Sequence, residues 1–285
     1  MRSFDDSFND STLGSHLRRT CQRQAGLAAL GCDGEQRSYG WLAARAAYMA
    51  DRLTEHGVRS GDRVGVCLER SAELVVMLLA CIRSGVCFVP LEPTLPLPSL
   101  RSMARRVNVQ LVVMGAPLRD AFPMPVLGLR PGLGSGDNWP EQNKHLAVCL
   151  LPAEVTGRGD LQLSHQELAG YLQRITERAQ ACAGTRWLAA SALADEAAVL
   201  EILGPLWVGG YVEITPTVLH NRPGELAALL QRRQDINTLQ GDVGFWERLL
   251  KTGWRGHCGF QALCAGADRG RRRLERLWLP PARSC

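Results

Sequence analysis

Residues Asp62 to Pro93 read DRVGVCLERSAELVVMLLACIRSGVCFVPLEP, and this stretch decides the fold. The apolar segment 64–68 has the length and composition of a buried strand. Ser71 then stands before a strongly apolar segment, 72–83, as an N-cap residue stands before a helix. A second short apolar segment, 86–89, follows and leads into a proline-bounded turn. Because a crossover helix is what joins two parallel strands, the stretch predicts a parallel sheet in an α/β fold.

Strands and helices alternate on both sides of this stretch. Further helices are expected at 13–23, 39–56, 97–106, 164–181, 195–206, 224–233 and 245–251. Further strands are expected at 26–32, 110–114, 145–151, 186–190, 211–214, 238–239 and 260–265. The pattern predicts an α/β protein with largely parallel sheets flanked by helices. We expect a flexible N-terminus at 1–14, a first α/β lobe at 15–140 and a second α/β lobe at 141–285.

The composition is that of a soluble globular protein. The 285 residues are 46% hydrophobic and 21% charged, which is close to the average for such proteins. No stretch of 18 uncharged apolar residues occurs, so no transmembrane helix and no membrane partner are expected. The N-terminal sequence MRSFDDSFNDSTLGSH lacks the apolar core of a signal peptide, and this predicts a cytoplasmic protein.

The formal net charge is +5, and the densest run of basic residues lies near the C-terminus. The residues of this basic run are Arg269, Arg271, Arg272, Arg273 and Arg276. Such a run suits either a nucleic-acid patch or a solvated helix face. We prefer the solvated helix face and expect no nucleic-acid partner.

The ten cysteines are spaced irregularly and include no C-x-x-C pair. Neither a zinc knuckle nor a thioredoxin-like motif is therefore indicated. Four of them lie within apolar runs, namely Cys67, Cys81, Cys87 and Cys149. In such surroundings cysteine behaves as a small hydrophobic residue, so we expect reduced core cysteines in a reducing compartment. The histidines are scattered along the chain, and no metal site is predicted.

Two short motifs carry a resemblance to a known family. Residues 83–93, RSGVCFVPLEP, look like a K-A-G-x-A-Y-V-P-L-D-P motif, and residues 38–42, SYGWL, look like an L-T-Y-x-E-L motif. Both motifs belong to the amino acid adenylation domains of nonribosomal peptide synthetases, which are AMP-binding, adenylate-forming enzymes. The resemblance runs from Leu13 to Leu277 and implies the large N-terminal domain of these enzymes. The family's N-x-Y-G-P-T-E motif, ribose-binding aspartate and small C-terminal domain are missing, which implies a truncated portion.

A third family motif is the phosphate-binding loop, Y-T-S-G-S-T-G-x-P-K-G. In such a loop, glycine lets the backbone approach the phosphates, N–H and hydroxyl groups donate to oxygen, and lysine adds positive charge. The matching residues here are 151–160, LPAEVTGRGD. The resemblance assigns phosphate binding, in degenerate form, to Thr156, Gly157 and Arg158.

Several residues of this loop depart from the family pattern. Pro152 has no backbone N–H to donate, and Ala153 and Val155 replace hydroxyl side chains. Glu154 and Asp160 bring negative charge, and the lysine is missing. Two like charges about 4 Å apart repel by roughly 4 kcal/mol at a surface-like dielectric. We therefore expect that the chain alone binds neither ATP nor Mg²⁺.

A fourth match concerns the substrate. Residues 192–204, ALADEAAVLEILG, resemble S-F-D-A-S-V-W-E-I-F-G, in which the aspartate binds the α-ammonium group of the amino acid. Glu196 takes the place of that aspartate, and Ala197 and Leu200 take neighbouring pocket positions. An alternative explanation is that Asp195 and Glu196 favour a helix N-terminus by capping and through the helix dipole.

The remaining vestigial substrate positions lie further along the chain. Gly244 aligns with a pocket position, and the end of a V-G-G-E-type strand places Leu263 and Ala265 on the pocket wall. The pair Ser164 and His165 copies a structural pair of the family. No catalytic residue is predicted.

Three hypotheses for the function follow. The first is a pseudoenzyme of secondary metabolism, without ligase activity on its own, that acts as a scaffold or binding partner. Its partners would be a condensation domain or an MbtH-like protein, which the resemblance places on the part of the fold that includes residues 83–106. The second is an adenylating enzyme completed in trans by a separate C-terminal half, which would then use ATP and Mg²⁺. The third is a truncated remnant without a function.

Overall fold

The computed structural model describes residues 12–116, 121–135, 139, 145–151, 160–193, 195–215 and 218–264. Within these residues the chain is an α/β protein whose strands form two six-stranded sheets. This confirms the fold class expected from the alternation of apolar segments.

The first sheet contains the parallel strands predicted from residues 62–93. Its strand order is β6-β5-β3-β4-β7-β8. The strands are β3 (Arg63–Cys67), β4 (Cys87–Pro90), β5 (Leu111–Met114), β6 (Val126–Gly128), β7 (Leu146–Leu150) and β8 (Leu161–Ser164). All neighbours pair in parallel except β7 and β8, which are antiparallel.

The second sheet has the order β12-β11-β9-β10-β1-β2. Its strands are β1 (Ala28–Cys32), β2 (Glu35–Ser38), β9 (Arg186–Ala189), β10 (Tyr211–Ile214), β11 (Thr238–Gly241) and β12 (Gln261–Cys264). Here too a single antiparallel strand, β2, closes one edge of an otherwise parallel sheet.

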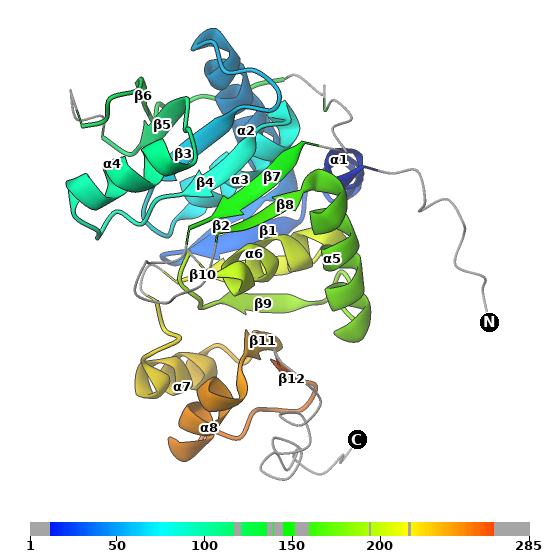
Figure 1. Ribbon diagram of the computed structural model, residues 1–285. Coiled ribbons are helices and arrows are strands. Elements are labelled where there is room, and N and C mark those ends of the chain that lie inside the picture. Colours follow the sequence, from blue (N-terminus) through cyan, green and yellow to red (C-terminus); the bar gives the residue numbers. More distant parts are fainter. Residues whose placement is uncertain are drawn as a thin grey trace.

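Helices lie between the two sheets and on the outer face of each sheet (Figure 1). They are α1 (Leu13–Arg23), α2 (Tyr39–Glu55), α3 (Ala72–Ser84), α4 (Leu97–Arg106), α5 (His165–Arg178), α6 (Glu196–Val208), α7 (Pro223–Arg232) and α8 (Val243–Lys251). Helices α2, α3, α5 and α6 share one large apolar core with residues of both sheets, so they lie between the sheets. Helix α4 covers the outer face of the first sheet, and α7 and α8 cover the outer face of the second.

Local sequence signals set the ends of α3, the crossover helix of the stretch 62–93. The Ser71 side chain accepts a hydrogen bond from the backbone N–H of Leu74, as predicted for an N-cap residue. The helix ends at Gly85, which has a φ of 67°, a conformation that glycine adopts without strain.

The two sheets do not follow the predicted boundary at residue 140. Strands β1 and β2 come from the N-terminal part of the chain but pair with β10, whereas β7 and β8 complete the first sheet. The Tyr39 hydroxyl, at the start of α2, also donates to the Gly210 carbonyl oxygen at 2.6 Å. The halves of the sequence are therefore interleaved. Leu13 and Gly14, the last two residues of the expected N-terminal segment, are buried in α1.

The four cysteines predicted to lie in the core are buried. Cys67, Cys81, Cys87 and Cys149 are all free thiols, and burial raises the pKa of each thiol. Among the described residues, no helix combines the length and apolar character needed to span a bilayer.

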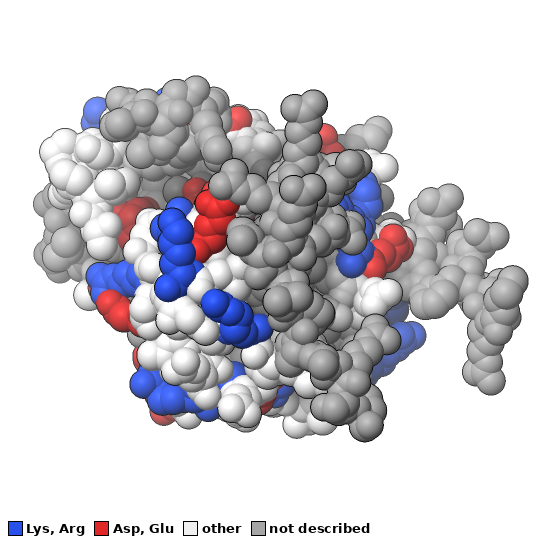
Figure 2. All heavy atoms as spheres, turned by 90° about the horizontal axis from the view of Figure 1, so that it is seen from below, with Lys and Arg blue, Asp and Glu red and all other residues white. Residues whose placement is uncertain are grey.

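The predicted basic run at 269–276 lies outside the described residues. On the face shown in Figure 2, the described arginine and lysine side chains are interspersed with carboxylates. The absence of a nucleic-acid partner stays a prediction.

Candidate functional site

The carboxyl ends of the two parallel sheets meet in one region of the molecule. Arg70, in the turn between β3 and α3, donates to the carbonyl oxygens of Ala189 and Thr215, at the ends of β9 and β10. The segment 151–160, which connects β7 to β8 and holds the predicted phosphate loop, begins at the same edge of the first sheet. Ligands of open α/β sheets bind outside the carboxyl ends of the strands, so this region is the candidate site.

Arg70 fixes the end of β9 from the side of the first sheet. Its guanidinium is buried, with 5% of the residue exposed. It donates to Thr215 O at 2.8 Å, to Ala189 O at 2.5 Å, and to Ser191 O. Burial lowers the pKa of Arg70, and the charge of Glu201 opposes this change. One side chain thus satisfies three backbone acceptors of the second sheet.

Glu201, on α6, holds the same turn from the other side. One of its carboxylate oxygens accepts from the backbone N–H groups of Ala190 at 2.8 Å and Ser191 at 2.9 Å. The other oxygen accepts from the Ser191 hydroxyl at 2.7 Å. Burial raises the pKa of Glu201 to about 7, although the bonds from Ser191 and the charge of Arg70 act in the opposite direction. We call residues 189–193, held between these two charges, the β9 turn.

The β9 turn leads into the residues that resemble the family's amine clamp. Glu196 is the first residue of α6, and its side chain lies outside the described part of the chain. Ala197 is half-buried, whereas Leu200 is buried in the core between the sheets. Asp195 occupies the N-cap position, but its side chain accepts no capping hydrogen bond. The capping explanation for the Asp195 carboxylate therefore has no support from the geometry.

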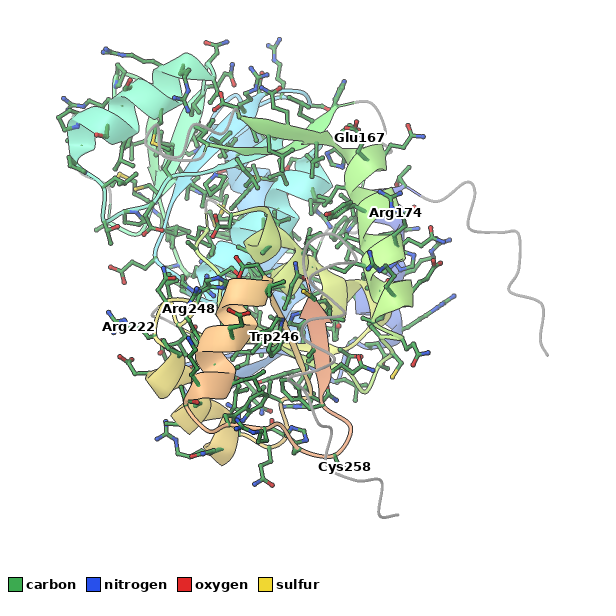
Figure 3. All side chains as sticks on the ribbon, turned by 60° about the horizontal axis from the view of Figure 1, so that its bottom comes forward. Glu167, Arg174, Arg222, Trp246, Arg248 and Cys258 are labelled. Atoms are coloured by element: carbon green, nitrogen blue, oxygen red, sulfur yellow. The ribbon has the colours of Figure 1, made fainter. Side chains whose placement is uncertain are left out.

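Two further predicted positions lie at the carboxyl ends of β11 and β12. Gly244 is in the first turn of α8, directly after β11, and Leu263 is half-buried on β12. The Leu263 carbonyl accepts from the indole N–H of Trp246 at 3.2 Å, and Figure 3 shows Trp246 between α8 and β12. Ala265 lies outside the described residues. The fold thus brings Gly244 and Leu263 to the same edge of the second sheet.

Two polar side chains in this part of the sheet were not predicted from the sequence. Gln240, which is opposite Leu263 in the β11–β12 register, is 5% exposed, and its buried amide oxygen has no partner among the described residues. The ring of His220 stacks on Phe245 with centroids 4.5 Å apart, and burial lowers its pKa.

The predicted phosphate residues Thr156, Gly157 and Arg158 lie outside the described residues, and so does Glu154. Asp160, at the end of the same segment, is described. Its carboxylate is 2.9 Å from the Arg106 guanidinium on α4. The expected free negative charge at Asp160 is therefore compensated by this ion pair.

Ser164 and His165 occupy structural positions, in line with the prediction. Ser164 is the N-cap of α5 and forms a reciprocal capping box with Glu167. His165 is buried, and burial lowers its pKa to about 4. Within the described residues, no group of three or more histidine, cysteine or acidic side chains is arranged to hold a metal ion.

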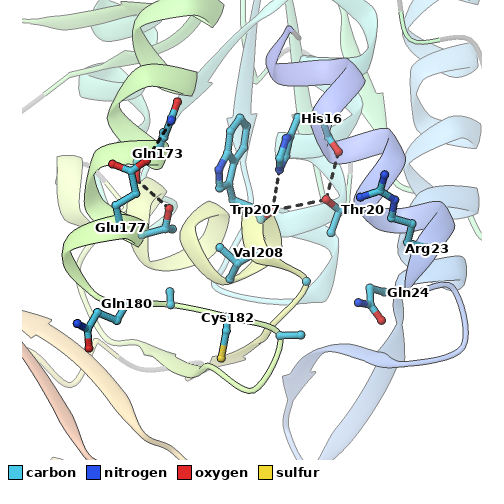
Figure 4. Close-up of a pocket in the computed structure, with 14 residues that line it drawn as sticks. His16, Thr20, Arg23, Gln24, Gln173, Glu177, Gln180, Cys182, Trp207 and Val208 are labelled. Atoms are coloured by element: carbon cyan, nitrogen blue, oxygen red, sulfur yellow. Dashed lines mark hydrogen bonds between the residues drawn. The ribbon is translucent and has the colours of Figure 1, made fainter. Parts of the chain in front are cut away.

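A separate cavity of about 620 Å³ lies at the opposite, amino-terminal end of β9 and β10 (Figure 4). It is bounded by α1, α5 and the end of α6, where the rings of His16 and Trp207 stack with centroids 3.7 Å apart. None of the predicted site residues lines it.

Comparisons with known proteins agree with this geometry. Residues 17–145 match the family model described as AMP-binding enzyme. The chain is 26% identical over 94% of its length to the PKS-NRPS hybrid synthetase acdB of Aspergillus candidus, of which it covers 11%. It is 32% identical over 70% of its length to the AMB antimetabolite synthetase AmbB of Pseudomonas aeruginosa, of which it covers 16%. It thus spans only a small part of these curated relatives.

Solved structures match over nearly the whole chain. A four-domain nonribosomal peptide synthetase bound to AMP and glycine superposes with a TM-score of 0.80 and 24% identity, over 93% of this chain and 20% of the other. The synthetase FmoA3 superposes with a TM-score of 0.79 and 20% identity, over 95% of this chain and 30% of the other. At these identities the superpositions establish the fold.

Residues 17–145 are thus similar to AMP-binding enzymes, and the fold of the chain is similar to that of a solved nonribosomal peptide synthetase. More particularly, the chain is similar to an adenylation-like domain of the nonribosomal peptide synthetase type, at about 26% identity to one such synthetase.

Proposed function

We propose that this adenylation-like domain does not activate amino acids on its own and serves as a scaffold or binding partner in nonribosomal peptide synthesis. The observation that carries the proposal is the composition of the β7–β8 connection, residues 151–160. It combines Pro152, Glu154 and Asp160 and contains no lysine.

Adenylation depends on positioning ATP and neutralising its phosphates, because the triphosphate and the pyrophosphate that leaves are highly charged. The hydrogen-bond donors and charges of the β7–β8 connection do not suit the binding of these phosphates. Thr156, Gly157 and Arg158 supply a hydroxyl, a flexible backbone and one positive charge. Glu154 places a carboxylate among them, and Arg106 pairs with Asp160. We therefore expect no binding of ATP or Mg²⁺ by the chain alone.

The preserved framework supports a role in binding. Both sheets, their covering helices and the buried contacts at the β9 turn form a well-packed domain independently of the phosphate loop. The relatives are multidomain synthetases, so components of such systems are the natural partners. A condensation domain or an MbtH-like protein would dock on the side that includes α4, where Arg105 is exposed.

The test has two arms. Amino-acid-dependent ATP–pyrophosphate exchange is measured for the chain alone and after mixing with other synthetase proteins. Exchange by the chain alone would contradict the proposal, and exchange only after mixing would favour an enzyme completed in trans. In the second arm, purified condensation domains and MbtH-like proteins are titrated against the chain and against an Arg105→Glu variant. Absence of binding in every titration would remove the scaffold role.

A further inference from the structure

We propose that Arg70 and Glu201 are positioning residues that lock the β9 turn to the turn between β3 and α3. The pair thereby fixes the segment that leads into Glu196. This inference builds on the proposed function, because that function makes the segment a remnant of a substrate site, but its geometric basis is independent of any activity.

The first step concerns the backbone groups of the β9 turn. The sheet pairing of β9 with β10 ends at Ala189, which is opposite Ile214. The N–H groups of Ala190 and Ser191 and the carbonyls of Ala189 and Ser191 are buried at this point, and buried backbone groups need partners. Glu201 supplies two acceptor contacts and Arg70 supplies donors, so side-chain charges take over where the sheet pairing stops.

The second step concerns the cost of moving the turn. Glu201 is fully buried and Arg70 is 5% exposed. A buried charge that loses its partners costs several kcal/mol. Any shift of the β9 turn that breaks these bonds leaves the buried Arg70 guanidinium and the buried Glu201 carboxyl group without these hydrogen-bond partners. The turn is therefore held much more tightly than turns fixed by neutral surface hydrogen bonds.

The third step concerns the connection between the sheets. Arg70 comes from the first sheet, and its three acceptors belong to the second, 119 to 145 residues away in the sequence. A movement of the β3–α3 turn relative to the second sheet must break contacts of the same guanidinium. The two carboxyl edges of the candidate site are therefore expected to move as one unit.

Hydrogen–deuterium exchange of the full chain, read by mass spectrometry, tests this inference. Glu201→Gln keeps the size of the side chain but brings an amide N–H₂ group toward backbone donors. We expect exchange of residues 189–193 to accelerate at least tenfold in this variant, with little change in α4 and β5. Arg70→Met is expected to accelerate exchange in both turns, and Arg70→Lys to restore part of the protection.

Two results would overturn the inference. One is unchanged protection of residues 189–193 in Glu201→Gln. The other is uniform acceleration over the whole chain, which would assign the pair to general stability. If Glu201→Gln does not fold, Ser191→Ala serves as the second variant, because it removes a single hydrogen bond to the carboxylate. We expect it to accelerate exchange of residues 189–193 as well, but by a smaller factor. No ligand is used, so the outcome is independent of whether the chain binds ATP.

Discussion

The β9 turn and the described end of the β7–β8 connection, Asp160, are held by different kinds of contacts. The β9 turn is fixed by buried Arg70 and Glu201, which together bond to the backbone at five points and to one hydroxyl. The end of the β7–β8 connection is fixed by a half-exposed ion pair, Arg106 with Asp160. The comparison indicates that buried contacts hold the β9 turn, whereas a partly exposed ion pair holds the described end of the β7–β8 connection.

The largest expected effect comes from removing a buried charge at the β9 turn. Arg70→Met leaves Glu201 buried without its positive neighbour and removes the hydrogen bonds that Arg70 donates to three carbonyl oxygens. We expect the free energy of unfolding to fall by about 3–5 kcal/mol, measured by urea denaturation. Arg106→Met is the matched control on the other region, and equal losses in the two variants would contradict the contrast between the regions.

The second largest expected effect is a pH dependence of the stability, caused by Glu201. Its pKa in the folded chain is about 7, above the ordinary value of 4.5. The folded state therefore favours the protonated form of Glu201. The stability that this preference contributes is fully present below pH 4.5 and is lost as the pH rises through about 7. Relative to Glu201→Gln, the wild-type chain should lose about 3 kcal/mol over this interval. Urea denaturation of both proteins between pH 4.5 and 8 measures the difference, and a constant difference would refute the buried-acid explanation.

A smaller loss of stability is expected from a change at Ser164, the N-cap residue of α5. Ser164→Ala removes the N-cap of α5 and its reciprocal contact with Glu167. Loss of such a cap costs about 1 kcal/mol, which a thermal unfolding curve detects. Ser164→Asp keeps an acceptor at the cap and should preserve most of the stability, so similar losses in both variants would argue against capping.

The smallest effect is expected at the exposed ion pair. Asp160→Asn breaks the contact with Arg106, and pairs of this kind contribute about 1 kcal/mol or less. The loss should shrink further in high salt because salt screens exposed charges. A loss above 3 kcal/mol would show that the two regions are held with similar strength.

Much of the fold is predictable from the sequence, because apolar segments and caps are local signals. The crossover unit at 62–93, its N-cap Ser71 and the α/β class all emerge in this way. The interleaving of the two sheets cannot be predicted from such local signals. The pairing of β1 with β10 joins residues that are about 180 positions apart, and no local pattern records it.

The candidate site is predictable only in part. The resemblance assigns Glu196 and Gly244 to one substrate site, and in the fold they lie in the first turns of α6 and α8, the helices that follow β9 and β11 in the chain. Arg70 and Glu201 were missed, although Glu201 left a signal: it is the one charged residue in the apolar sequence AAVLEILGPLWV, which follows Glu196 in α6. A single charge in such surroundings requires a buried partner. The partner itself depends on tertiary contact and is not readable from the helix.

The central claim is that the β7–β8 connection cannot hold a nucleotide triphosphate. Isothermal titration calorimetry of ATP into the purified chain, with and without Mg²⁺, tests it most directly. We predict no heat of specific binding in either condition. Saturable, magnesium-dependent binding of ATP at micromolar concentration would contradict the claim.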